Sequence, residues 1–351
     1  MFEQHLNFGT DGCFVDSWER IPLCVRTDVP QEKNYLLTVT LRAEEDEPEL
    51  MVFAGRRHLA YSGTLAAGES LCREISVNVC ATIPRPSDNG SFGAGVELRV
   101  VGRRIRLTAL DIREAVLPTV YIAGDSTVAS QGGGTPYDPS STYCGWGQML
   151  GAYLNYTMVV CNQAHCGLDT ESFRTEGHFD IVMRNIRAGD FFLIQFGHND
   201  QKQVHLQARA GYCANLFQYI QEVRDKGAYP ILVTPLARNT WANGICMDSL
   251  GDYAVVCKEL GQALDVPVLD LHGLSLAWLK CVGQEAASAY RYPDDATHPN
   301  DYGAYLAADF IRNELHRTCS GLPGYQSLAD AVTSGFGPWT PEKGQKNETP
   351  L

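Results

Sequence analysis

The N-terminal third of the chain alternates hydrophobic and polar residues with a period of two. In the segment YLLTVTLRAE, Leu37, Val39 and Leu41 occupy every second position. The same alternation recurs in REISVNVCA and, on both sides of Gly102, in VELRVVGRRIRLTALDI. Alternate residues of a strand face opposite sides of a sheet, and no helical pattern separates these segments. Residues 1–117 are therefore predicted to form an antiparallel β-sandwich.

Beyond residue 117 the pattern changes to unbroken apolar runs, which are TVYIAG, TMVVCN, DFFLIQFG, PILVTP and VPVLDL. Amphipathic stretches separate them, and in one of these Leu216, Tyr219, Ile220 and Val223 share a helical face. Strands buried on both faces and alternating with helices predict a parallel sheet between two helical layers, an α/β fold over residues 118–318.

The remaining residues, 319–351, form a Gly/Pro-rich C-terminal extension. Its end, PEKGQKNETPL, is predicted to be a mobile tail. The N-terminal MFEQHLNFGTDG has neither the basic nor the apolar region of a signal peptide, which predicts a cytoplasmic protein and gives the sequon at Asn347 little meaning.

Composition narrows the range of partners. The chain has 351 residues, with 28 Lys and Arg against 41 Asp and Glu, and a net charge of −13. This acidic balance argues against a nucleic-acid partner or an anionic membrane, and no apolar stretch is long enough to cross a bilayer. The twelve cysteines are scattered without a C-x-x-C pair, so reduced thiols are predicted rather than disulfides or a zinc site.

The first of the buried runs ends in Gly124, Asp125, Ser126 and Thr127. Taken alone, these residues are typical of turns and helix N-caps. In an open α/β sheet, however, sites form beyond the carboxyl ends of the strands. We therefore expect Ser126 to lie at a site and also at the start of a helix, where developing negative charge is favoured.

Three further stretches carry polar side chains to the same end of the predicted sheet. CNQAHCGLDTESF follows the second strand, IQFGHNDQK contains the end of the third, and DDATHPNDYGAYLAADF precedes the last helix. Their candidate residues are Asn162, Gly167, His198, Asn199, Asp200, Asp295 and His298.

These stretches resemble the sequence blocks of the SGNH (GDSL-type) hydrolases over residues 118–317. AGDST, FGHND and DATHPNDYGA are most similar to carbohydrate esterases of the rhamnogalacturonan acetylesterase type. The resemblance implies an SGNH-hydrolase-type α/β/α sandwich, and the upstream β-sandwich resembles the galactose-binding-like N-terminal module of two-domain members. The catalytic domain would then span residues 118–318, after an accessory module at 1–117.

The resemblance also implies a role for each residue that matches the family motifs. Ser126 would be the nucleophile, His298 its general base, and Asp295 the carboxylate that orients the histidine. The backbone N–H groups of Ser126 and Gly167 and the side-chain amide of Asn199 would form the oxyanion hole. His198, Asp200 and Asn162 are interpreted as structural residues that hold these loops.

Physical chemistry supports this choice of residue types. A serine hydroxyl needs a base within hydrogen-bond reach, and histidine can accept its proton and return it to the leaving alcohol. A carboxylate on the other ring nitrogen fixes the tautomer and stabilises the imidazolium. G-x-S-x-G is absent around Ser126, which disfavours the α/β-hydrolase fold.

Other residues are candidates for the same site. His165 and Cys166 are interpreted as structural, because a complete triad exists without them. Trp146, Tyr212 and Trp241 are candidates for stacking on a sugar, with packing in the core or rim as the alternative. Some family members carry Arg-Ser after the oxyanion-hole glycine where this chain has Leu168 and Asp169, so sugar specificity does not follow from the resemblance.

The function expected from these features is a serine esterase that removes O-acetyl groups from carbohydrate through an acetyl-enzyme. The substrate implied by the resemblance is an acetylated rhamnogalacturonan oligosaccharide, and no metal or organic cofactor is expected. The alternatives are another acetylated sugar such as a xylan fragment, a lipase or thioesterase of the SGNH group, and a carbohydrate-binding protein with an inert hydrolase domain.

Overall fold

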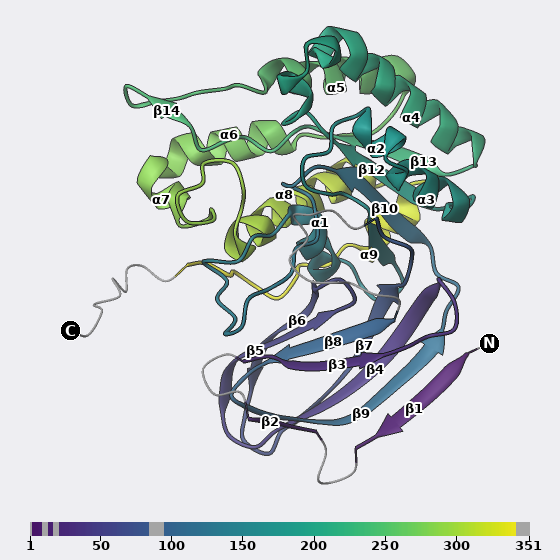
Figure 1. Ribbon diagram of the computed structural model, residues 1–351, viewed down its shortest axis with the longest axis vertical. Helices are drawn as coiled ribbons and strands as arrows, with labels where there is room; N and C mark the ends of the chain where they lie inside the picture. The colour runs from purple at the N-terminus through teal and green to yellow at the C-terminus, as the bar shows by residue number, and fades with distance from the viewer. Residues whose placement is uncertain (1, 9–12, 17–20, 84–94, 342–351) are drawn as a thin grey trace.

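The computed structural model describes residues 2–8, 13–16, 21–83 and 95–341. In these residues the N-terminal part forms two antiparallel sheets (Figure 1). The first consists of β1 (Glu3–Asn7), β2 (Cys13–Asp16), β4 (Asn34–Ala43), β7 (Ser70–Asn78) and β9 (Arg104–Glu114). The second consists of β3 (Leu23–Thr27), β5 (Glu47–Ala54), β6 (His58–Leu65) and β8 (Val96–Val101).

The alternation in the sequence explains why these sheets pack face to face. Leu37 and Leu41 of β4 are buried in one cluster with Val52 of β5 and Leu98 of β8. The polar residues that alternate with them in β4 face outward, and Arg42 among them is exposed. The predicted β-sandwich is therefore confirmed.

The second part contains a parallel sheet of five strands in the order β11-β10-β12-β13-β16. The strands are β10 (Thr119–Gly124), β11 (Val159–Asn162), β12 (Phe191–Gln195), β13 (Tyr229–Val233) and β16 (Val268–Leu269). β10 hydrogen-bonds to β11 on one side and to β12 on the other. Every residue of β10, β11 and β12 is buried, as their unbroken apolar runs predict.

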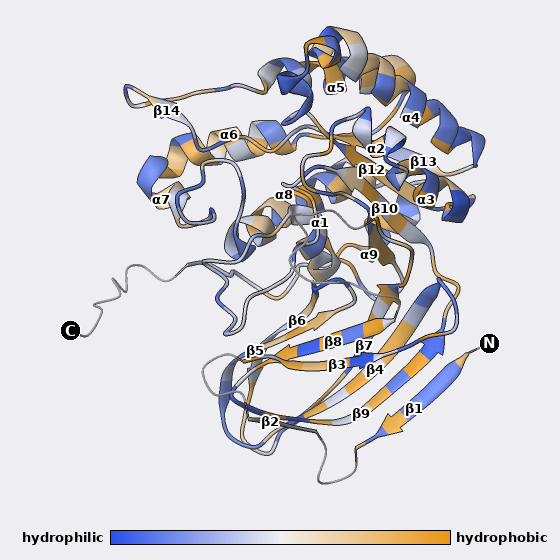
Figure 2. Ribbon diagram, in the orientation of Figure 1, coloured by the Kyte–Doolittle hydropathy of each residue, from blue (hydrophilic) through white to orange (hydrophobic). Residues whose placement is uncertain are grey.

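Helices cover both faces of the parallel sheet, which gives the predicted three layers. The helices of this part are α1 (Trp146–Met149), α2 (Ser172–Thr175), α3 (His178–Asn185), α4 (Cys213–Asp225), α5 (Gly251–Leu264), α6 (Leu271–Val282), α7 (Gln284–Ser288), α8 (Asp301–Cys319) and α9 (Gln326–Ala331). α1, α8 and α9 pack with residues such as Val120 and Ile122 on one face, and α2 to α5 pack with Tyr121 and Ala123 on the other. Figure 2 shows the apolar strands between helices whose outer faces are polar. The predicted helical face of Leu216 and its partners is the buried face of α4.

Shorter elements complete the described chain. They are the 3-10 turns η2 (Leu150–Tyr153), η3 (Asp200–Lys202) and η4 (Val204–Leu206), the π-turn η5 (Ala208–Tyr212), and the hairpin β14 (Trp241–Ala242) and β15 (Ile245–Cys246). In the C-terminal extension, Leu328 and Ala329 of α9 belong to the same buried cluster as Phe191 of β12. The predicted mobile tail and Asn347 extend into 342–351, outside the described residues.

The sandwich and the α/β part share buried residues where they meet. Met51, Phe53 and Leu59 of the second sheet belong to one cluster with Trp146 and Leu150 of the α/β part. Figure 1 shows the two parts side by side, with β10 following β9 after a short connection. The sandwich is therefore packed against the layer that contains α1 and α8.

The structure bears on two further predictions, which concern membrane-spanning segments and the state of the cysteines. Among the described residues, no helix is long and apolar enough to cross a membrane. The cysteines with described side chains are free thiols, of which Cys144, Cys161, Cys246, Cys257 and Cys319 are buried.

Candidate active site

The loops that follow β10, β11 and β12 meet at the carboxyl edge of the parallel sheet. β10 lies between the other two strands, so the chain turns in opposite directions on either side of it. Such a switch point is where open α/β sheets form their sites. Ser126, Gly167 and Asn199 follow these three strands, and the structure places all three loops at this edge.

Ser126 lies in a single turn rather than at the start of a helix, which corrects the prediction. The N–H groups of Val128 and Ala129 donate to the Asp125 carbonyl, but the next helix begins only at Trp146. The turn ends because its own carbonyls accept hydrogen bonds from elsewhere. The Gly145 N–H donates to the Ala129 carbonyl, and the Trp146 N–H donates to the Thr127 carbonyl, both at 3.0 Å.

Glycine at position 145 permits this close approach. A Cβ atom there would overlap the backbone of Val128 and Ala129. The side chains of the turn are also held, because Asp125 Oδ1 accepts hydrogen bonds from the N–H and the hydroxyl of Thr127. The turn that carries Ser126 is therefore fixed by contacts on both sides.

Ser126, His298 and Asp295 form a hydrogen-bonded chain. Ser126 Oγ lies 2.8 Å from His298 Nε2, and His298 Nδ1 lies 2.7 Å from Asp295 Oδ2. Asp295 Oδ1 accepts hydrogen bonds from the N–H groups of Thr297 and His298. Burial alone would raise the pKa of Asp295, but these hydrogen bonds outweigh it and hold that pKa below its usual value. An ionised carboxylate thus faces the ring nitrogen opposite the serine.

The segment that carries Asp295 and His298 is folded back on itself just before α8. The Tyr292 N–H donates to the His298 carbonyl, and the Asp295 N–H donates to the Tyr292 carbonyl, each at 3.0 Å. Buried Arg291 donates hydrogen bonds to the carbonyls of Ala237 and Thr297. These contacts determine where the imidazole stands relative to Ser126.

Three N–H donors are available beside the serine. Within the described residues, neither the Ser126 N–H nor the Gly167 N–H has a hydrogen-bond acceptor. Gly167 has φ = 79°, a left-handed conformation that glycine adopts without strain, and it is exposed. Asn199 Nδ2 donates one hydrogen to the Leu168 carbonyl at 2.9 Å, which leaves its second hydrogen for another acceptor.

Lys202 fixes the orientation of the Asn199 amide. Its Nζ donates to Asn199 Oδ1 at 2.8 Å, so the carbonyl end of the amide is occupied and the NH₂ end faces Leu168. This arrangement suits a group that donates to a developing oxyanion.

His198 and Asp200 hold the loop of Asn199, in agreement with their interpretation as structural residues. His198 Nδ1 lies 3.1 Å from Asp125 Oδ2, and its Nε2 lies 2.9 Å from the Leu236 carbonyl. Burial alone would raise the pKa of Asp125, but the charge and hydrogen bond of His198 and the hydrogen bonds of Thr127 keep that pKa below its usual value. The pair joins the turn that carries Ser126 to the Asn199 loop.

Asp200 joins the Asn199 loop to the Gly167 loop. Its carboxylate accepts hydrogen bonds from the N–H and hydroxyl of Thr170 and from the N–H of Gly197. Burial raises the pKa of Asp200 to about 6. Asn162 also braces a loop, since its Nδ2 donates to the Val128 carbonyl at 2.8 Å.

Two tyrosines beside the histidine are site residues that sequence reasoning missed. Tyr143 stacks on Tyr292 with ring centroids 3.6 Å apart, and the Tyr143 ring meets the His298 ring edge-on at a centroid distance of 5.7 Å. Neither residue lies in a recognisable motif. Only the fold shows that the loop before α1 and the loop before α8 come together here.

The aromatic candidates for sugar stacking separate into two groups. Trp146 and Tyr212 are completely buried, so they cannot contact a sugar. Trp146 instead donates from its indole N–H to Gln195 at 2.7 Å. Trp241 is half-buried in the β14–β15 hairpin and donates to Asn239 Oδ1.

The chemistry available at this site is acyl transfer by a serine. Among the residues that the structure describes, no group of three or more His, Cys, Asp or Glu side chains is placed to hold a metal ion. His165 is buried, and Cys166 Sγ accepts a hydrogen bond from Gln131. The chain of Ser126, His298 and Asp295 is complete without either.

Comparison with known proteins gives consistent matches. Residues 122–306 match the GDSL-like Lipase/Acylhydrolase family. The "Probable rhamnogalacturonan acetylesterase YesY" of Bacillus subtilis (strain 168) is 32% identical over 217 residues, which are 60% of this chain and 96% of YesY. Rhamnogalacturonan acetylesterase RhgT of the same organism is 33% identical over 218 residues, 58% of this chain and 91% of RhgT.

A solved structure extends the match to the β-sandwich. The crystal structure of YxiM from Bacillus subtilis has 27% sequence identity and a TM-score of 0.55, and the match covers 85% of this chain and 81% of YxiM. That share of the chain is larger than the α/β part alone, so the similarity reaches into the N-terminal sheets.

Proposed function

Because the chain belongs to the GDSL-like lipase/acylhydrolase family and is a carboxylic ester hydrolase, we propose that it removes O-acetyl groups from rhamnogalacturonan oligosaccharides. The observation that carries this proposal is the hydrogen-bonded chain of Ser126, His298 and Asp295 at the switch point. The names of YesY and RhgT support this substrate. Both proteins align with the chain over nearly their whole lengths.

In the proposed acylation step, Ser126 Oγ attacks the acetyl carbonyl carbon while its proton moves to His298 Nε2. Asp295 stabilises the resulting imidazolium through Nδ1. The N–H groups of Ser126 and Gly167 and the Asn199 amide donate to the oxyanion. When the intermediate collapses, the bond to the sugar oxygen breaks and His298 returns the proton to that oxygen.

In deacylation, water replaces the sugar hydroxyl. The water oxygen attacks the acetyl carbonyl carbon of the acyl-enzyme while His298 accepts a proton from the water. Collapse of the second intermediate releases acetate, and the proton returns to Ser126 Oγ. The roles of Ser126, Gly167, Asn199, Asp295 and His298 in these two steps form part of the proposal.

The proposal includes a division of the chain. Residues 1–117 would be an accessory β-sandwich module, residues 118–318 the catalytic domain, and 319–351 a C-terminal extension. The short connection between β9 and β10 supports the first boundary. The described part of the extension packs on the catalytic domain through α9 and Trp339, and Phe336 contacts Tyr61 of the sandwich.

The experiment that tests the proposal is acetate release from acetylated rhamnogalacturonan and xylan oligosaccharides. Wild type is compared with Ser126→Ala and with Ser327→Ala, a control at an exposed serine of α9. We expect release from the pectic substrate, unchanged in Ser327→Ala and reduced about 10⁴-fold or more in Ser126→Ala. Release from xylan alone would refute the substrate, and release that persists in Ser126→Ala would refute the nucleophile.

A further inference from the structure

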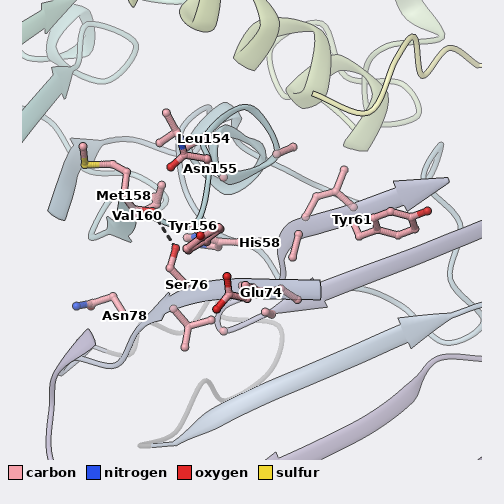
Figure 3. Close-up of a pocket in the computed structure, with 18 of the residues that line it drawn as sticks. His58, Tyr61, Glu74, Ser76, Asn78, Leu154, Asn155, Tyr156, Met158 and Val160 are labelled. Carbon is pink, nitrogen blue, oxygen red and sulfur yellow. Dashed lines mark hydrogen bonds between the residues drawn. The ribbon is translucent and has the colours of Figure 1, made fainter. Parts of the chain in front are cut away.

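A cavity of about 650 Å³ lies between the β-sandwich and the catalytic domain. The sandwich lines it with β6 and β7, the catalytic domain with the segment from Gly151 to Asn162, and the C-terminal extension with residues near Phe336. Figure 3 shows Glu74 and Ser76 on one side of it and Leu154, Asn155 and Met158 on the other. The five residues proposed for catalysis are not among those that line it. Its volume is within the range of small-molecule sites.

The cavity exists because two sheets meet edge to edge. β7 is the last strand of the first sandwich sheet, and β11 is the last strand of the parallel sheet. Across the gap, the Ser76 hydroxyl donates to the Met158 carbonyl at 2.8 Å. Edge strands leave one row of backbone polar groups without strand partners, so this gap presents hydrogen-bonding groups to a polar occupant.

Aromatic rings from both parts of the chain line the cavity. Tyr61 of β6 and Phe336 of the C-terminal extension lie with ring centroids 5.6 Å apart and a tilt of 58°. Both are half-buried, and Tyr156 is 45% exposed at the same cavity. Half-buried rings offer the flat apolar surface on which the C–H face of a sugar packs.

Arg73 supplies a positive charge beside these rings. Its guanidinium carbon lies 5.8 Å from the centroids of both Tyr61 and Phe336. In the described part of the chain, no carboxylate forms an ion pair with Arg73. An arginine held against rings, with no acidic partner in a chain of net charge −13, is placed to pair with the carboxylate of a ligand.

The other ionisable groups of the cavity leave its charge positive. Besides Arg73 the lining includes Arg56 and a single carboxylate, that of Glu74. Glu74 Oε1 lies 3.8 Å from Arg113 Nη2. Burial, together with Arg56 and Arg57, lowers the pKa of His58 to about 3, so its ring is neutral. The cavity therefore combines positive charge, aromatic rings and side-chain amide groups.

We propose that this cavity binds a uronate-containing segment of an oligosaccharide, with a sugar face on Tyr61 and Phe336 and a carboxylate on Arg73. The inference rests on the proposed function, because it makes the cavity an accessory site for the chain whose acetyl group is cleaved at Ser126. Attachment at two sites raises the effective concentration of acetyl groups near the serine. Only a substrate long enough to occupy both sites at once gains this benefit.

The test compares Arg73→Gln with Arg42→Gln, a matched control at an exposed arginine of the same sandwich sheet that does not line the cavity. Binding of deacetylated galacturonate-containing oligosaccharides is measured by calorimetry at low and high salt, with neutral xylo-oligosaccharides of equal length alongside. We expect Arg73→Gln to weaken binding of the acidic chains roughly tenfold and Arg42→Gln to leave it unchanged. Equal binding by Arg73→Gln and wild type, or equal binding of neutral chains, would overturn the inference.

Kinetics separate this inference from the proposed function. Arg73→Gln should raise KM for long acetylated pectic oligosaccharides while kcat/KM for a small chromogenic acetate ester stays at the wild-type value, which also shows that the variant folds. Unchanged KM on long substrates would refute the accessory site while the esterase assignment stands. No acetate release from any pectic substrate by wild type would refute the proposed function, whatever the binding result.

Discussion

Arg57 and Asp301 form a buried ion pair that joins the β-sandwich to the start of α8. Arg57 Nη1 and Nη2 lie 2.6 and 2.9 Å from the two oxygens of the Asp301 carboxylate, and both side chains are almost completely buried. The same guanidinium donates to the carbonyls of Gln131 and Tyr143. Asp301 follows His298 by three residues, so an arginine of the sandwich fixes the loops on both sides of the proposed site.

The first prediction concerns this pair. Arg57→Met leaves the Asp301 carboxylate buried without its partner, which we expect to lower the free energy of unfolding by about 3–5 kcal/mol. Asp301→Asn leaves the buried Arg57 guanidinium without its carboxylate, and we expect a similar loss. Urea denaturation followed by tryptophan fluorescence measures both losses.

A double variant, Arg57→Met with Asp301→Leu, serves as the control. Because it removes both charges, we expect it to be more stable than the sum of the two single losses predicts. Additive losses would show that the pair is not coupled in the folded protein.

The second prediction concerns Asn199 and Lys202. Asn199→Ala removes one of the proposed donors to the oxyanion, so kcat should fall about 10²- to 10³-fold with little change in KM. Lys202→Met keeps the donor but releases its orientation, and we expect a smaller loss, on the order of tenfold or less. Steady-state kinetics on an acetate ester measures both effects, and a larger effect at Lys202 than at Asn199 would contradict the prediction.

The third prediction concerns Gly145. In Gly145→Ala the new methyl group would overlap the backbone of Val128 and Ala129, so the turn that carries Ser126 has to move. We expect kcat on a small acetate ester to fall more than tenfold, since misplaced reacting groups lose much of the benefit of orientation. Gly151→Ala, whose Cβ would meet only ordinary contacts, should keep wild-type activity on the same ester. Equal activities of the two variants would contradict the role given to Gly145.

The fourth prediction concerns pH. Asp200 has a pKa of about 6 in the folded protein, above its ordinary value of 3.8. Between these two pH values the folded chain holds a proton that the unfolded chain has released. The contribution of Asp200 to stability is therefore fully present below pH 3.8 and is lost as the pH rises through 6, by roughly 3 kcal/mol in total.

Asp200→Asn isolates this effect. The variant cannot ionise, so the difference in unfolding free energy between wild type and variant should change steadily as the pH rises from about 4 to about 6 and level off at higher pH, where Asp200 is ionised in both states. Denaturant titrations at a series of pH values measure it. A difference that is constant over the lower range would show that Asp200 does not titrate as its burial implies.

Much of the candidate site could be proposed from the sequence because the residues concerned lie in short motifs. Ser126, Asn199, Asp295 and His298 stand in AGDST, FGHND and DATHPNDYGA, and each motif lies at the end of a strand or the start of a helix. Tyr143, Gly145 and Arg57 carry no such signal. They matter because of partners far away in the sequence, such as Asp301, which is 244 residues from Arg57.

The two kinds of sheet and the order of the candidate residues follow from the sequence alone. Period-two alternation and continuous apolar runs are local properties, and burial on one or both faces of a strand follows from them directly. The single turn at Ser126 and the burial of Trp146 could not be inferred in this way. Both depend on contacts between distant segments, since the residues that end the Ser126 turn are Gly145 and Trp146, packed against it by the fold. The cavity beside Arg73 has the same origin, because it forms where β7 and β11, the edges of two separate sheets, meet.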